Sequence, residues 1–263
     1  MHLNEGSSQS RSLAKPLQVP LAFCLLVSAC LAGSPATAGS PPTKEQSRQQ
    51  GSSRPAPLVK EQSHQFIGQH PNPLANELES LSVSAEETFE AAIAGKLDRL
   101  PKKFEAVKKN AASIPPIQDD SNANLLPHLR HTITELEQAV NSKDRLEVMR
   151  YANRVSLIAA TLAVPLKPCV PTEVSLLDYN ARELVIWSEM KRIERLSSIV
   201  IRMHLAWQAL MPKLVDRNAT KELRRFSDLM GHLEAAKTPE EYNRISRLLS
   251  NELNSMKLVF ARK

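Results

Sequence analysis

The sequence contains few cysteines and few glycines, and each scarcity excludes a class of protein. Three of the 263 residues are cysteine, at positions 24, 30 and 169, and this is too few for the disulfide framework of a small secreted scaffold. Only seven residues are glycine, and Gly231 is the single one after Gly95. A long segment with so little glycine is typical of helices, so we expect an all-α protein.

The sequence also lacks the motifs that most enzymes of known chemistry carry. It contains no glycine-rich phosphate loop, no Ser-His-Asp signature and no His-Glu-x-x-His sequence. A Cys-x-x-Cys-His sequence for covalent haem attachment is missing as well. We therefore predict a protein that is not an enzyme and that needs no cofactor.

Near its start the chain has an apolar run that begins at Leu17, after a polar segment with Arg11 and Lys15. The run is about 14 to 17 residues long, shorter than the roughly 20 residues that a membrane-spanning helix needs. It ends in Val27-Ser28-Ala29-Cys30. This arrangement of a basic segment, a short apolar run and small residues predicts an export signal.

The four residues at positions 27–30 resemble the lipobox of bacterial lipoprotein signal peptides, and the resemblance covers residues 1–31. It implies that residues 1–29 are removed and that Cys30 carries acyl chains such as palmitate, which attach the protein to a membrane. Leu31 occupies the position where an aspartate tends to retain such proteins at the inner membrane. The resemblance thus implies a periplasm-facing, lipid-anchored protein, at the outer membrane.

Two other fates of the leader are open. Cleavage after Ala36-Thr37-Ala38 would release a soluble secreted periplasmic protein, and an uncleaved leader would itself be the anchor. Residues 30–74 that follow are rich in Ser, Pro and Gln and have few apolar side chains. Such a segment cannot bury enough surface to offset its chain entropy, so we predict a disordered tether with a root-mean-square reach of roughly 35 Å.

From Leu74 onward, apolar residues recur at helical spacing between regularly placed breakers. One set of breakers, at Ile114-Pro115-Pro116, Val164-Pro165 and Met211-Pro212, repeats about every 48 residues, and a second set lies between them. Each repeat reads as two antiparallel helices with a short turn. The sequence therefore predicts a helical domain over 75–263 with four αα-hairpins, or about eight helices, at 75–114, 122–164, 172–211 and 217–260.

The hairpins can pack as a helical bundle or stack as a short α-solenoid. If the breakers at Gly95, Ser142 and Ser188 only kink the chain, four long helices in one bundle are the third possibility. Pro101 and Pro239 favour hairpins, because a first helical turn tolerates proline and a helix interior does not. Thr238 is placed to cap a helix that begins at Pro239. In the third hairpin the expected core stripe comprises Ile193, Leu196, Val200, Met203, Trp207 and Leu210.

Two groups of residues are candidates for a binding site. His128 and His131 lie one helical turn apart, a spacing found in metal sites, although the apolar stripe of that helix leaves them near the surface. Asp178 and Arg182 can pair across one turn, Tyr179 can extend their network, and Trp187 lies two turns further on. This second group predicts either a structural lock of the third hairpin or a ligand or partner pocket.

The net charge of +6 is concentrated in the second half of the chain, where an acidic partner protein or anionic lipid could bind. Export makes nucleic acid an unsuitable partner. We therefore predict a lipid-anchored binding or scaffold module whose partner is another envelope protein. The alternative is a helical bundle that binds metal or haem in a sensing or redox role, with pairs such as Met203-His204 and Met230 with His232 as haem ligands. Cys169 stands alone in a proline-rich connector.

Overall fold

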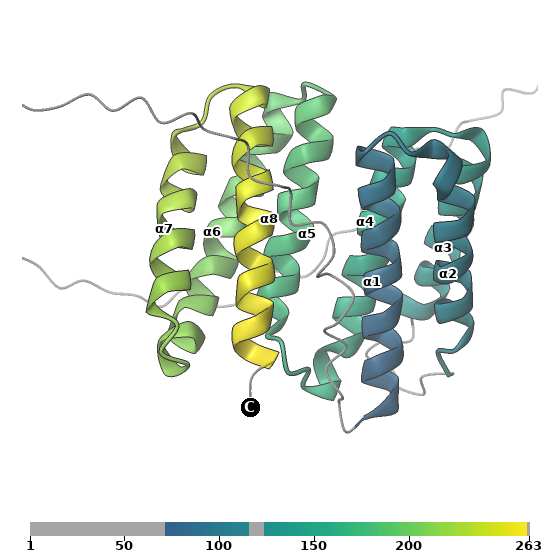
Figure 1. The fold of residues 1–263 in the computed structure, drawn as a ribbon, viewed down its shortest axis with the longest axis horizontal. Coiled ribbons are helices and arrows are strands. Elements are labelled where there is room, and N and C mark those ends of the chain that lie inside the picture. Colours follow the sequence, from purple (N-terminus) through teal and green to yellow (C-terminus); the bar gives the residue numbers. More distant parts are fainter. Residues whose placement is uncertain (1–71, 116–123, 262–263) are drawn as a thin grey trace, which may run out of the picture. The chain divides into compact units, whose positions relative to one another are not determined.

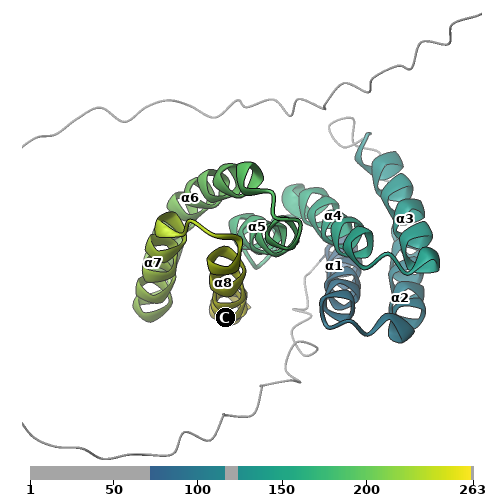
Figure 2. The same cartoon turned by 90° about the horizontal axis from the view of Figure 1, so that it is seen from above.

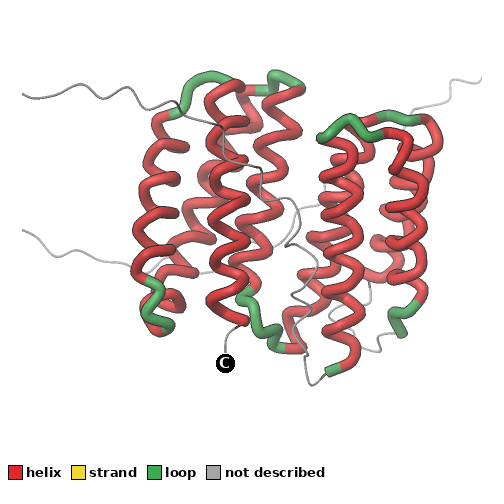
Figure 3. The backbone as a smooth tube through the Cα atoms, viewed as in Figure 1, coloured by secondary structure: helices red, strands yellow, loops and turns green. Residues whose placement is uncertain are grey.

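The computed structural model describes residues 72–115 and 124–261. All of them belong to Leu58–Lys263, one of the two compact units of the chain, and only this unit is described below. The predicted signal peptide, the acylation site Cys30 and nearly all of the predicted tether lie outside the described residues. The described residues form eight α-helices and no strand, which confirms the all-α fold class (Figures 1 and 3).

The eight helices form four antiparallel pairs in chain order. Their bounds are α1 Pro73–Ile93, α2 Leu100–Ala112, α3 Leu125–Ser142, α4 Arg145–Ala163, α5 Thr172–Glu189, α6 Ile193–Asp216, α7 Thr220–Ala235 and α8 Pro239–Ala261. Short 3-10 helices, η1 at Leu97–Arg99 and η3 at Val164–Leu166, precede α2 and follow α4. The N-cap of α1 is Asn72, whose Oδ1 accepts from the Leu74 amide at 3.0 Å, so this helix begins inside the last residues of the predicted tether.

The pairs pack as two four-helix bundles. In the first bundle, α1 and α3 each pack against both α2 and α4. In the second bundle, α5 and α7 each pack against both α6 and α8. The two bundles meet where α4 packs on α5, as Figure 2 shows from above. Of the predicted packings, the structure thus has helical bundles built from hairpins.

The repeat of about 48 residues has a structural basis in the turns within the first three hairpins. Each turn contains one residue with a left-handed backbone, at three positions 48 residues apart: Gly95 (φ 68°), Lys143 (φ 57°) and Lys191 (φ 53°). In each case the next amide donates to the carbonyl five residues earlier, as from Asp144 to Ala139 at 3.0 Å, which closes the helix end. The third turn lies just past the predicted break at Ser188-Glu189.

Two sequence-based expectations for α6 are wrong. Pro212 does not end the helix, which continues to Asp216. Its ring is exposed, so the helix loses one amide donor on the solvent side, while Leu210 and Leu214 are buried on either side of it and hold the helix in the core. Ile193, expected in the core stripe, is 51% exposed because it is the first residue of α6, before the helix reaches its neighbours.

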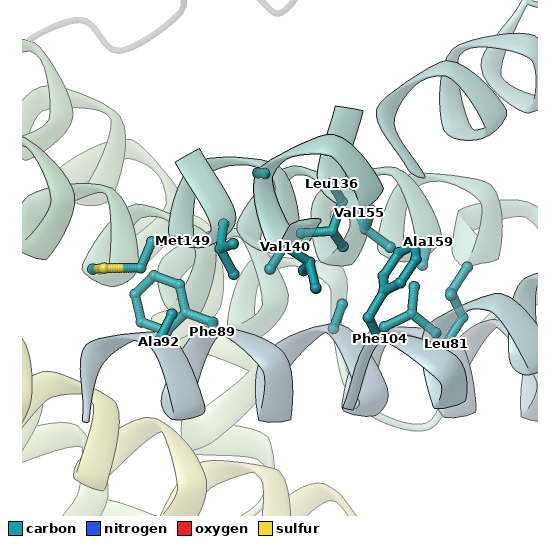
Figure 4. Close-up of a cluster of buried hydrophobic side chains, with 14 of the residues drawn as sticks. Leu81, Phe89, Ala92, Phe104, Leu136, Val140, Met149, Val155 and Ala159 are labelled. Atoms are coloured by element: carbon teal, nitrogen blue, oxygen red, sulfur yellow. The ribbon is translucent and has the colours of Figure 1, made fainter. Parts of the chain in front are cut away.

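Each bundle has its own apolar core. In the first, side chains from all four helices meet; Figure 4 shows Leu81, Phe89, Ala92, Phe104, Leu136, Val140, Met149, Val155 and Ala159. In the second, Trp207 of α6 stacks at a tilt on Phe226 of α7, with ring centroids 4.6 Å apart. None of the helices in the described ranges is both long enough and apolar enough to cross a membrane.

Candidate functional site

Helix α5 holds the four residues that the sequence predicts as one binding group, but it separates them onto two sides. Asp178 and Arg182 are buried, with 5% and 6% of their surface exposed, whereas Tyr179 and Trp187 are half-buried. Trp187 follows Asp178 by nine residues, or two and a half helical turns. The two side chains therefore point to opposite sides of α5. The four side chains thus do not all lie on one side of α5.

On the buried side, four charged residues form a network that we call the charged junction: Glu86 of α1, Asp178 and Arg182 of α5, and Lys257 of α8. Lys257 Nζ lies 2.7 Å from Asp178 Oδ2 and 3.5 Å from Glu86 Oε2. Arg182 Nη1 lies 3.4 Å from Glu86 Oε1 and 3.5 Å from Asp178 Oδ2. Two cations and two carboxylates thus compensate each other where the first and second bundles meet.

The ionisation of the charged junction follows from these contacts. Burial alone would raise the pKa of Asp178, but the Arg182 guanidinium and the Lys257 ammonium lower it below its ordinary value of 3.8. Burial likewise opposes the charge of Lys257, and the Asp178 and Glu86 carboxylates raise its pKa in spite of it. Asp178, Arg182 and Lys257 are therefore charged at neutral pH.

On the other side of α5, Trp187 lies between two arginines from neighbouring helices. The guanidinium carbon of Arg150 on α4 is 6.0 Å from the Trp187 ring centroid, and that of Arg195 on α6 is 5.5 Å from it. Both distances are within the range of a cation–π interaction. Trp187 Nε1 donates to Glu183 Oε2 at 2.7 Å, which fixes the indole.

Two turns away, Tyr179 is also under the influence of two arginines, one from each neighbouring helix. The charges of Arg154 on α4 and Arg202 on α6 both act to lower the pKa of Tyr179. Arg202 Nε also donates to Asn180 Oδ1 at 3.1 Å. Burial, followed by the Glu183 carboxylate, raises the pKa of Tyr179 to about 12, so its hydroxyl stays protonated. We call the whole surface the arginine–aromatic face; it comprises Arg150, Arg154, Tyr179, Trp187, Arg195 and Arg202.

The charges of the arginine–aromatic face are only partly compensated. Arg150 pairs with Glu147 one turn away on α4. Within residues 72–115 and 124–261, no ion pair engages Arg154, Arg195 or Arg202. This is the opposite of the charged junction, where each charge has a partner of the other sign.

Asn153 of α4 connects the two sides of α5, and sequence reasoning missed it. Its side chain is fully buried; Oδ1 accepts from Arg182 Nε at 2.8 Å, and Nδ2 donates to the Tyr179 carbonyl at 3.1 Å and to Glu183 Oε1 at 3.3 Å. Tyr179 is therefore connected to Arg182 through its backbone carbonyl and the Asn153 side chain. An asparagine at a core position of an apolar helix is the signal that could have indicated a buried polar contact.

The two histidines predicted as metal ligands, His128 and His131, both lie on α3. His131 is exposed and lies 3.9 Å from Glu135, while burial and the nearby Arg154 lower the pKa of His128. Among the described residues, no group of three or more His, Cys, Asp and Glu side chains is arranged to hold a metal ion. Asp119 and Asp120, the two aspartates that precede α3 in the sequence, lie outside the described residues.

The residues that could serve as haem ligands lie in the core and at the surface of the second bundle. Met203 and Met230 are buried in the core of the second bundle. His204 lies at its surface, where Nδ1 is 2.8 Å from Glu234 Oε1 of α7 and Nε2 is 2.8 Å from the Gln208 amide. Cys169 is exposed in the connector between η3 and α5.

The fold and the two sides of α5 define the class of this protein as a pair of four-helix bundles joined by buried charges, with an arginine-rich surface at their meeting point. Comparison of the chain with protein-family models, with curated proteins and with solved structures finds no match in any of the three. Its function is therefore argued from its own residues.

Proposed function

We propose that this chain is a lipid-anchored protein of the bacterial cell envelope that has no enzymatic activity and binds another envelope protein. The observation that supports the binding role is the arginine–aromatic face, where three arginines that form no ion pair within residues 72–115 and 124–261 lie around half-buried Tyr179 and Trp187. Arginine, tryptophan and tyrosine are the residues that most often dominate the binding energy of protein interfaces.

Exposed apolar residues continue this surface along α6. Ile201 and Leu205 are 63% and 56% exposed, one helical turn apart, and Leu205 follows Arg202 of the arginine–aromatic face by three residues, a spacing at which side chains are neighbours on a helix. Large aliphatic side chains next to aromatic groups and arginines are what the buried centre of a protein interface requires. We therefore propose that the partner covers α6 together with the half-buried side of α5 that holds Tyr179 and Trp187.

The location is proposed on the leader sequence. Acylation of Cys30 would attach the protein to the membrane by its lipid alone, because several acyl chains on one residue hold a protein essentially permanently. The helical unit then needs no membrane-binding surface of its own, which leaves the arginine–aromatic face available to a protein partner.

Site-specific photo-crosslinking in intact cells tests the binding role. A photo-reactive amino acid would replace Ile201 or Leu205 of the full chain, and the matched control would replace Lys102, an exposed residue on α2 in the other bundle. We expect a discrete crosslinked protein from positions 201 and 205 and none from position 102. Equal yields from all three positions, or no adduct from any, would remove the basis of the proposed binding role.

A further inference from the structure

We infer that the arginine–aromatic face binds an acidic segment of a partner protein, one that carries both carboxylates and apolar side chains. This inference rests on the proposed function and specifies the chemistry of the partner. It follows from three features of the face: the excess of positive charge, the fixed position of its guanidinium groups, and the apolar residues at its edge.

The excess of positive charge arises because, in the described part of the chain, only Arg150 among the four arginines forms an ion pair. Glu183 lies on the same stripe of α5, but its two oxygens accept from Trp187 Nε1 and from the buried Asn153 amide. Glu147 is taken up by Arg150. No carboxylate in the described part of the chain forms an ion pair with Arg154, Arg195 or Arg202. Carboxylates from a partner would supply the missing countercharge.

Three of the four arginines are also held in position before any partner arrives. Arg150 and Arg195 lie against the Trp187 ring, and Arg202 is held by its bond to Asn180. Groups that are ordered in advance lose less entropy on binding, and the planar guanidinium fork matches a carboxylate with two parallel hydrogen bonds. The four arginines come from α4 on one side of α5 and from α6 on the other, so an elongated segment lying along α5 can reach both rows.

The apolar edge favours a protein over other polyanions. Ile201 and Leu205 are exposed beside Arg202, and they offer contact to aliphatic side chains, which a nucleic acid backbone lacks. A lipid surface would satisfy the arginines, but the proposed acylation already provides membrane attachment. An acidic amphipathic segment uses the charged, aromatic and apolar parts of this surface together.

The test measures binding of a designed peptide to the full chain. The probe is a labelled amphipathic peptide in which glutamates alternate with leucines, and its control has glutamine at each glutamate position. Trp187 fluorescence reports on occupancy, because the other tryptophan, Trp207, is buried in the core of the second bundle. We expect saturable binding of the acidic peptide, weakened by salt, and at least about tenfold weaker binding of the control.

Two double variants remove the same net charge from different surfaces. Arg195→Gln with Arg202→Gln alters the face, and Lys102→Gln with Lys109→Gln alters exposed positions on α2. We expect the first to weaken peptide binding by about tenfold or more and the second by less than about twofold. A third variant, Arg154→Gln, alters an exposed arginine of α4, and we expect it to weaken peptide binding as well. Helical circular dichroism verifies that each variant is folded.

Several results would overturn the inference. Equal binding of the acidic and glutamine peptides would do so, as would equal losses in the two double variants, which would show a dependence on net charge alone. Binding of anionic phospholipid vesicles or of short DNA through Arg195 and Arg202, without binding of the acidic peptide, would assign the face to another ligand class. If crosslinking from Ile201 succeeds while the peptide fails, only this inference is wrong; if crosslinking also fails, the proposed binding role is wrong too.

Discussion

The charged junction allows a quantitative prediction about Lys257. Replacing it by methionine keeps most of the side-chain volume but removes the ammonium that lies 2.7 Å from Asp178 and 3.5 Å from Glu86. The remaining charges are two carboxylates and one guanidinium, so one buried negative charge is left uncompensated. Breaking a buried ion pair in this way costs about 3–5 kcal/mol, and since the Lys257 side chain is 26% exposed we expect a smaller cost, about 2–3 kcal/mol.

A double-mutant cycle separates the pair from its surroundings. Asp178→Asn alone should also destabilise the protein, because Lys257 and Arg182 then share only Glu86. With both substitutions Arg182 and Glu86 balance each other again, so the two losses should not add, and we expect a coupling of about 1–2 kcal/mol. The assay is urea unfolding at pH 7, followed by the helical circular dichroism signal.

The control for this cycle is a surface ion pair. Lys213 lies 2.7 Å from Glu173, but its side chain is 45% exposed, so Lys213→Met should cost less than about 1 kcal/mol. The folded-state pKa of Asp178 lies below its ordinary value of 3.8, so its contribution is present above that value and lost as the pH falls further. If Lys257→Met lowers the free energy of unfolding no more than Lys213→Met does, or if the cycle shows no coupling, the charged junction does not stabilise the fold as described.

Three further predictions concern single residues and the same unfolding assay. Lys143→Gly should stabilise the protein by about 0.5–1 kcal/mol, because Lys143 has a left-handed backbone that glycine adopts without strain; a loss of stability would contradict this turn geometry. Thr238→Ala should cost about 1 kcal/mol, because Thr238 Oγ1 accepts from the Glu241 amide at the start of α8; an unchanged midpoint would exclude the cap. Glu252→Gln should stabilise the protein at pH 7, since burial raises the pKa of Glu252 above its ordinary 4.5 and Oε1 has no hydrogen-bond partner. The native state therefore binds a proton at Glu252 more tightly than the unfolded chain does. The charged Glu252 destabilises the native state as the pH rises above 4.5, so the advantage of glutamine should vanish below that pH.

Local features of the sequence predicted the helices well. Apolar periodicity and breakers about every 48 residues identify four hairpins, and the turns at Gly95, Lys143 and Lys191 show why the period exists. The cap at Thr238 is also confirmed, because capping depends only on residues within one turn. Pro212 was misjudged because the surrounding leucines, and not the local backbone preference, decide whether α6 continues.

The candidate site was harder to predict because it depends on distant parts of the chain. The pair of Asp178 and Arg182 could be foreseen from its spacing within one helix. Their partners Glu86 and Lys257 are separated by 171 positions, and nothing local connects them. The arginine–aromatic face likewise requires α4 and α6 to flank α5, which a sequence pattern does not specify.

The proposal depends most directly on where the helical unit is delivered, and the intact mass of the protein from its native membranes tests this. We predict that the chain begins at Cys30 and carries the added mass of acyl chains on that residue. A mass that matches the unprocessed chain, recovered from inside the cell, would contradict the proposal of a lipid-anchored envelope protein.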